Sequence, residues 1–212
     1  LQAAEGVFPR QPGMRESLRH FLLFAETLLD KMLAIGGRYP YQRIAMSGHE
    51  PMLALSDAGQ GGIIATAHMG CLELMQVAAR WREGFRVTIL VHTAHARQFN
   101  RILARLNPEA GVQLMQVTEF SPAMAMLLAD RVAAGEFVAI AADRVPVTGD
   151  RTCRASFLGA DADFPAGPWL IASLLRCPVW ALSCLHAGDG YAARIDRLFE
   201  RVELPRADRQ GA

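Results

Sequence analysis

The feature that most constrains the fold is an alternation of short apolar runs with helix-like segments, which begins after the Gly61-Gly62 pair. The apolar runs have the length of buried strands, and the segments between them have the spacing of helices. Strands are expected over residues 63–67, 85–91, 112–117, 136–142, near 155–158, and over 178–185 and 191–199. Helices are expected over 70–82, 95–106, 122–134 and 167–175. Strands that alternate with helices form βαβ units, so the sequence predicts an α/β fold with a largely parallel sheet covered on both faces.

The longest helical pattern precedes this alternation, over residues 14–35. Its apolar residues recur at the i, i+3, i+4, i+7 spacing of one helical face; they are Leu18, Phe21, Leu22, Ala25, Leu28, Leu29, Met32 and Leu33. Docking of this face on the domain core is the favoured interpretation, and contact with a membrane or with a preceding segment is the alternative. We expect residues 1–50 to form a helical preface, 51–204 the α/β core and 205–212 a frayed tail.

The charge balance argues against one class of function. The formal net charge of the 212 residues is +1, so bulk charge does not favour binding to nucleic acid. Every basic residue except Lys31 is an arginine. Two explanations of this composition are open. One is a coding bias, and the other is recognition of phosphate or carboxylate head groups, which the planar guanidinium binds through two parallel hydrogen bonds.

Several common types of site have no support in the sequence. The four cysteines form no C-x-x-C pair and have no histidine at metal-ligand spacing, so we expect reduced thiols and no metal site. The sequence contains no G-x-S-x-G elbow, Walker loop or G-x-G-x-x-G motif, which argues against an α/β-hydrolase and against nucleotide binding. Arg176 and Pro178 interrupt the most apolar stretch, 169–185, so we expect no segment that crosses a bilayer.

The strongest candidates for chemistry are His68 and Glu73. Ligands of parallel sheets bind beyond the carboxyl ends of the strands, and His68 directly follows the predicted strand 63–67. Gly70 lets the chain turn, and Glu73 falls in the first turn of the next predicted helix, so we expect the two side chains to touch. A carboxylate that accepts a hydrogen bond from one imidazole nitrogen leaves the other nitrogen as a general base. The alternative is that His68 only begins the helix and Glu73 only interacts with the helix dipole.

Other polar residues follow predicted strands at the same edge. His92 and His95 come after the strand 85–91. The helix that follows carries a polar set, namely Arg97, Asn100, Arg101 and Arg105. Its arginine stripe predicts either a solvated basic face or a site for an anion or a head group.

Two more candidates lie further along the chain. Asp143 and Arg144 follow the strand 136–142, again at the expected edge. Gly167 is predicted to begin a helix whose backbone N–H groups can bind an anion, with ordinary turn chemistry as the alternative.

Four blocks of the sequence, taken in order, resemble the lysophospholipid acyltransferase superfamily. Residues 66–73, Thr-Ala-His-Met-Gly-Cys-Leu-Glu, resemble its H-x4-[DE] signature, and within the superfamily they are most similar to the lipid A late acyltransferases of the lauroyl and myristoyl transferase type. Ala142-Asp143-Arg144 resembles the family's Asp-Gln step after a buried strand. Residues 157–168 resemble its Phe-Phe-Gly and Pro-x-Gly blocks, and 177–179 resemble its Ala-Pro-Val block.

The chain also departs from the lipid A branch. Met69, Cys71 and Leu72 change the usual spelling around His68, and His92-Thr93 stands where the branch has Arg-Pro. The segment 95–100 is more similar to acyltransferases of aryl polyene clusters, so the resemblance implies an acceptor other than a lipid A precursor. Members of the family usually begin with a hydrophobic anchoring segment, and we therefore expect this sequence to be part of a longer chain.

The resemblance implies a glycerol-3-phosphate acyltransferase-like fold around a mixed, mostly parallel sheet. It implies an O-acyltransferase of cell-envelope lipid biosynthesis, in which His68 deprotonates a lipid hydroxyl and Glu73 holds His68. The acyl donor is expected to be a thioester of acyl carrier protein or of coenzyme A, with no bound cofactor. Arg144, Arg154 or an N–H near Gly167 is expected to stabilise the oxyanion, and Asp143 to orient one of these groups.

The residues to which we assign substrate binding are Gly70, His92, His95, Arg97, Asn100, Asp143, Arg144, Arg154 and Gly167. The expected location is peripheral, on the cytoplasmic face of the inner membrane. Two other functions remain open at this stage: a non-catalytic lipid-binding relative, and a thioester hydrolase that uses His68 and Glu73 on water.

Overall fold

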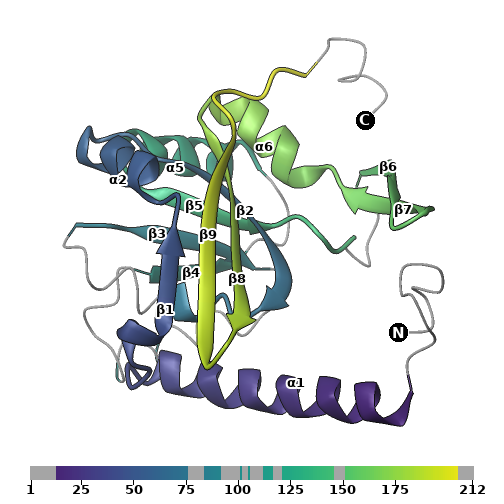
Figure 1. Cartoon of the computed structure of the whole chain (residues 1–212). Helices are drawn as coiled ribbons and strands as arrows, with labels where there is room; N and C mark the ends of the chain where they lie inside the picture. The colour runs from purple at the N-terminus through teal and green to yellow at the C-terminus, as the bar shows by residue number, and fades with distance from the viewer. Residues whose placement is uncertain are drawn as a thin grey trace.

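A seven-stranded sheet forms the centre of the protein (Figure 1). The computed structural model describes residues 13–75, 84–91, 101, 105, 112–116, 121–145 and 151–204. The strands of this sheet are β1 (Ile44–Ser47), β2 (Gly62–Gly70), β3 (Val87–Val91), β4 (Val112–Gln116), β5 (Phe137–Ala141), β8 (Val179–Ala187) and β9 (Gly190–Phe199). Their order is β1-β9-β8-β2-β5-β3-β4, and all neighbouring pairs are parallel except β8 and β9. The predicted α/β class with a mixed, mostly parallel sheet is therefore confirmed.

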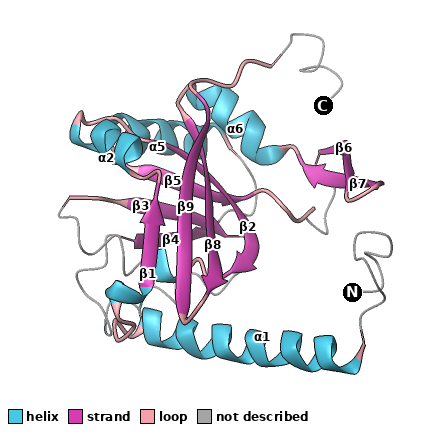
Figure 2. Cartoon of the chain, viewed as in Figure 1, coloured by secondary structure: helices cyan, strands magenta, loops and turns pink. Residues whose placement is uncertain are grey.

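Successive side chains of a strand point to opposite faces of the sheet, and in the central strands β2 and β5 successive residues are buried, so both faces are covered there. Ile63 of β2 and Val138 of β5 belong to the core beneath α5 (Pro122–Ala133) and α6 (Gly167–Leu175). Ile64, the next residue of β2, packs instead with Trp180 and with α2 (Glu50–Asp57). Figure 2 shows the helices around the strands. The apolar runs that predicted buried strands are thus covered on two sides.

Local signals agree with the helix ends. Ser121 precedes α5, and its hydroxyl accepts a hydrogen bond from the backbone N–H of Met124, which is the usual role of an N-cap serine. Pro122 occupies the first turn, where a missing N–H costs nothing. The observed bounds of α5 lie within a residue of the predicted 122–134, and those of α6 coincide with the predicted 167–175.

The long amino-terminal helix α1 (Met14–Ile35) has the predicted bounds, but the favoured interpretation of its apolar face is wrong. Only Ala34 and Ile35 of this helix are buried, and most of its large apolar side chains are exposed. Figure 1 shows α1 crossing one end of the sheet below the β8–β9 turn, with its amino-terminal half extending beyond the strands. Of the described helices, none is both long and apolar enough to span a membrane.

Some elements of the fold were not expected from the sequence. The edge strand β1 pairs with β9, so the predicted helical preface contributes a strand to the sheet. It is followed by α2 and preceded by a short 3-10 helix, η2 (Tyr41–Arg43). The predicted tail, most of the predicted helix 95–106 and the later part of the predicted helix 70–82 lie outside the described residues.

A separate antiparallel hairpin consists of β6 (Thr152–Phe157) and β7 (Ala160–Pro165). Its two-residue loop, Leu158 and Gly159, has φ of 52° and 84°. Two positive φ angles suit a tight hairpin whose twist matches the strands. Figure 1 shows this hairpin set apart from the seven-stranded sheet.

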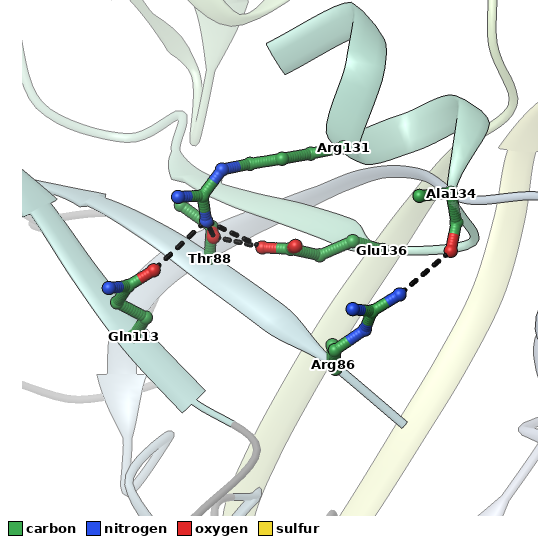
Figure 3. Close-up of polar contacts among 6 residues, drawn as sticks. All are labelled: Arg86, Thr88, Gln113, Arg131, Ala134 and Glu136. Atoms are coloured by element: carbon green, nitrogen blue, oxygen red, sulfur yellow. Dashed lines mark hydrogen bonds and ion pairs between the residues drawn. The ribbon is translucent and has the colours of Figure 1, made fainter. Parts of the chain in front are cut away.

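A polar network lies near the amino-terminal ends of β3, β4 and β5 (Figure 3). The guanidinium of Arg131 donates hydrogen bonds to Glu136 at 2.9 Å, to Gln113 at 3.0 Å and to the hydroxyl of Thr88. Thr88 is fully buried and also donates to Glu136. Because buried charges need partners, this network ties α5 to the sheet at the end opposite to the candidate site.

Candidate active site

The candidate site lies where β2 and β5 end side by side. These strands are parallel neighbours, so their carboxyl ends share one edge of the sheet. His68 stands near the end of β2, and Asp143 follows β5 by two residues. The backbone N–H of Ala142 donates to the carbonyl of Thr66 at 2.8 Å, which extends the pairing to the point where the site begins.

Asp143 binds His68 through two hydrogen bonds. One carboxylate oxygen lies 2.9 Å from Nδ1 of the imidazole, and the other accepts the backbone N–H of His68 at 2.8 Å. An ionised carboxylate can only accept, so Nδ1 carries a proton, and in the neutral imidazole Nε2 then has a free lone pair. The side chain of His68 is 49% exposed, so the imidazole is accessible from solvent.

A β-bulge positions His68. Thr66 pairs with Leu182 of β8, whereas Gly70 pairs with Cys184, so three residues of β2 oppose a single residue of β8. Bulges of this kind bend a strand and re-aim its side chains, and they are frequent beside active sites. The predicted strand 63–67 implied that His68 follows the strand. In the structure β2 continues through the bulge to Gly70, so His68 lies within its last part.

Gly70 closes the bulge and has no substitute there. Its φ is +67°, and a Cβ at this position would lie 1.9 Å from the carbonyl oxygen of Cys184. Both facts exclude any other residue without a shift of the backbone. The role of Gly70 visible in the structure is therefore to let the chain turn away from β8 directly after His68.

The electrostatics of the pair favour ionised Asp143. Partial burial raises the pKa of this carboxyl, but the hydrogen bonds from the backbone and the ring of His68 outweigh burial, and the net pKa lies below its ordinary value. Asp143 is therefore negative at neutral pH. In that state it holds the tautomer described above and stabilises an imidazolium when one forms.

Glu73 does not contact His68, contrary to the expectation from the sequence. Its carboxylate forms an ion pair with Lys31 of α1 at 2.5 Å and accepts a weak hydrogen bond from the thiol of Cys71 at 3.9 Å. Within the described residues, the imidazole has Asp143 and not Glu73 as its acidic partner. The turn after β2 thus directs the Glu73 side chain toward α1.

Cys71 lies three residues after His68, but its environment disfavours a nucleophilic role. The side chain is fully buried, and burial, followed by the nearby carboxylate of Glu73, raises the pKa of its thiol to about 11. At neutral pH the group is a protonated thiol, which is a poor nucleophile. The burial and the raised pKa of Cys71 therefore disfavour this thiol as a nucleophile.

The remaining candidate residues are distributed differently from the prediction. Arg144 follows Asp143, is exposed and has no recorded partner within the described part of the chain. Arg154 lies on the separate hairpin, where Asp163 accepts two hydrogen bonds from its guanidinium, at 3.0 and 3.2 Å. Gly167 begins α6 and has open space where a side chain would stand. His92, His95, Arg97 and Asn100 lie outside the described residues.

Two exposed apolar side chains adjoin the site residues in sequence. Met69 and Val145, the neighbours in sequence of His68 and Arg144, are both exposed apolar side chains. No group of three or more His, Cys, Asp or Glu side chains that could hold a metal ion occurs in the described ranges. The His68–Asp143 pair can chemically take a proton from a hydroxyl or from water.

Lys31 is a residue of this region that the sequence did not single out for the site. It belongs to a helix that is distant in sequence from the H-x4-E motif, and no local pattern connects the two. Its status as the one lysine among arginines was visible in the sequence, but its pairing with Glu73 depends on the packing of α1.

Comparison with known proteins adds no assignment: no protein-family model matches the chain, and no curated protein is significantly similar to it.

Proposed function

We propose that the protein is an O-acyltransferase that moves a fatty acyl group from a thioester of acyl carrier protein or coenzyme A to a hydroxyl of a lipid acceptor. The observation that carries the proposal is the His68–Asp143 pair, a half-exposed imidazole with Nδ1 bound to an ionised carboxylate at the carboxyl edge of a mostly parallel sheet. The resemblance of residues 66–73 to an H-x4-[DE] signature supplies the reaction class, and with it the glycerol-3-phosphate acyltransferase-like fold.

The reaction follows from the free Nε2 of His68. This nitrogen takes the proton of the acceptor hydroxyl as the oxygen attacks the thioester carbonyl, so a C–O bond forms and an imidazolium appears. Asp143 stabilises the imidazolium through Nδ1. Collapse of the tetrahedral intermediate breaks the C–S bond, and the imidazolium returns its proton to the departing thiolate. The step needs no covalent enzyme intermediate.

The negative oxygen of the tetrahedral intermediate needs a donor. Arg144 is the stronger of the two arginine candidates, since it adjoins Asp143 in sequence and has no partner among the described residues, whereas Arg154 is already bound by Asp163. The N–H groups at the start of α6 near Gly167 are the alternative donors.

In this mechanism Asp143 takes the role that the sequence assigned to Glu73. Glu73 retains a structural link to the same corner through Lys31. Glu73→Gln is therefore expected to reduce transfer less than Asp143→Asn does. The opposite order would return the acidic role to Glu73.

The test is a product analysis. Purified protein is mixed with acyl carrier protein that carries a labelled acyl group and with a total lipid extract, and the label is followed into lipid and into free fatty acid. We expect label in a lipid with the wild type and none with His68→Ala. Asp196→Asn is the matched control for Asp143→Asn. Asp196, like Asp143, accepts hydrogen bonds from a neighbouring side chain, in its case Arg194, but it lies on β9 away from the site, and the variant should keep the wild-type rate.

One alternative function predicts a different product. His68 is exposed enough to activate water, and a thioester hydrolase would release free acid at the same rate with or without the lipid extract. That outcome would overturn the proposed acyl transfer.

A further inference from the structure

The apolar face of α1 is turned away from the domain. Its large side chains at the spacing of one helical face are between 46% and 68% exposed, and they are Leu18, Phe21, Leu22, Leu28, Leu29 and Met32. A row of this length on a helix surface exceeds the scattered apolar residues that are normal on proteins. Such a row indicates a surface that is covered by a partner.

The polar side of α1, by contrast, faces the domain. Glu26 lies 3.5 Å from Nε2 of His186, Asp30 accepts a hydrogen bond from the hydroxyl of Tyr191 at 3.1 Å, and Lys31 pairs with Glu73. At about 100° per residue, Glu26 and Asp30 lie opposite to Leu28, and Lys31 lies opposite to Leu22 and Leu29. A helix that packs on a core presents the reverse arrangement, apolar inward and polar outward.

The charges that remain outside on α1 are basic. Arg15 and Arg19 are exposed and have no ion-pair partner in the described part of the chain. Arg15 lies in the first turn, where the helix dipole favours carboxylates, so it is not placed there to stabilise the helix. The acidic side chains of α1 have partners within the protein: Glu16 accepts the N–H of Gly13 at the start of the helix, Glu26 lies near His186, and Asp30 accepts from Tyr191.

We propose that the outward face of α1 binds the interface of an anionic lipid bilayer, with the helix lying in the plane of the membrane. A helix of 22 residues is about 33 Å long and presents its apolar row along most of this length. Apolar side chains that enter the acyl region, with arginines at the head-group level, are the pattern of interfacial helices. A second copy of the chain fits less well, because α1 offers no free outward carboxylate to receive Arg15 and Arg19.

The helix that carries this surface packs against the same end of the sheet as the candidate site. Lys31 of α1 holds Glu73, five residues after His68, and Asp30 holds Tyr191 on the strand next to β8. A bilayer bound by α1 would therefore lie beside the edge of the sheet that carries His68. This consequence rests on the proposed acyl transfer, since it brings a lipid hydroxyl to the base, whereas the binding itself does not.

The test measures lipid binding without any thioester, so its failure is distinct from a failure of acyl transfer. The protein is mixed with vesicles of phosphatidylglycerol or of phosphatidylcholine, and bound protein is measured by flotation. We expect binding to phosphatidylglycerol to be about 30-fold tighter, the effect of two basic residues near an anionic surface. High salt and Arg15→Gln with Arg19→Gln should each remove most of this preference.

The decisive variant replaces two outward leucines, Leu18→Gln with Leu29→Gln. It should weaken binding to phosphatidylglycerol vesicles at least tenfold, because two side chains that enter the acyl region are lost. The control, Met126→Gln with Leu174→Gln, removes two exposed apolar residues from α5 and α6 and should leave binding unchanged. Equal binding of the leucine variant and the wild type would overturn the proposal. Failure of the wild type to bind phosphatidylglycerol vesicles would also overturn it. So would a dimer of the wild type in lipid-free solution that the leucine substitutions dissociate, because the face would then bind a second copy.

Discussion

Replacement of Asp143 by asparagine separates a role in catalysis from a role in folding. Asparagine has nearly the same shape as aspartate, but its amide can donate to Nδ1 of His68, which would place the imidazole proton on Nε2 and remove the base. Assistance by a general base contributes on the order of 10²–10⁴ in rate. We therefore expect Asp143→Asn to slow acyl transfer by about 100- to 10,000-fold, equivalent to about 3–5 kcal/mol in the activation free energy.

The cost in stability should be much smaller. The side chains of His68 and Asp143 are 49% and 28% exposed, so water replaces much of what the two hydrogen bonds provide. Screening of this kind reduces the contribution of an ion pair to about 1 kcal/mol or less. A variant that merely misfolds would lose both quantities together, so the contrast between the two identifies the role of Asp143.

Three measurements on Asp143→Asn check this contrast. The initial rate of acyl transfer gives the catalytic effect, urea unfolding gives the free energy of unfolding, and ¹⁵N NMR of the imidazole gives the tautomer of His68. We expect a proton on Nδ1 in the wild type and on Nε2 in the variant. If the variant keeps its rate within about threefold while Glu73→Gln loses the activity, Asp143 does not assist the base.

The structure makes three further predictions about stability and reactivity. Arg131→Met should lower the free energy of unfolding by about 3 kcal/mol, since it leaves the carboxylate of Glu136 buried without its ion pair, and the double variant with Glu136→Met should recover most of this loss in thermal unfolding. Because the pKa of Asp143 is lowered in the folded state, this carboxyl adds stability above about pH 4, and that stability is lost as the pH falls further. The difference in unfolding free energy between the wild type and Asp143→Asn should therefore shrink in acid. A difference that grew in acid would contradict the hydrogen bonds to His68. Cys153 is exposed and should react rapidly with an alkylating reagent, whereas the folded protein should protect the buried thiols Cys71, Cys177 and Cys184. Mass spectrometry measures the labelling of each cysteine. Equal labelling of all four would refute the packing around β2 and β8.

The sheet was predictable because its central strands are short, apolar and separated by helical segments. β1 was missed because four residues at a sheet edge leave almost no pattern, and its place depends on pairing with β9, which is distant in sequence. β7 carries alternating aspartates on an exposed hairpin, so it lacks the apolar run that identifies a buried strand.

The candidate site was predictable in its location but not in its pairing. The rule for parallel sheets placed both His68 and Asp143 at the same edge. The choice of Glu73 as the partner of His68 followed from proximity in sequence, and it did not anticipate that β5 lies next to β2 or that a bulge re-aims His68. Strand order and bulges arise from contacts between distant segments, which a local pattern does not contain.

The case of α1 shows a different limit. Periodicity identified its apolar face and its ends, but an amphipathic pattern does not say which side faces the domain. That orientation was decided by polar contacts with His186, Tyr191 and Glu73.

The most direct test of the proposed chemistry is the initial rate at which labelled acyl groups pass from acyl carrier protein to lipid, measured side by side for the wild type and His68→Ala. The proposed mechanism predicts labelled lipid with the wild type and a rate at least 100-fold lower with the variant, on the order of the contribution of a general base. Equal rates in the two proteins would show that His68 is not the base.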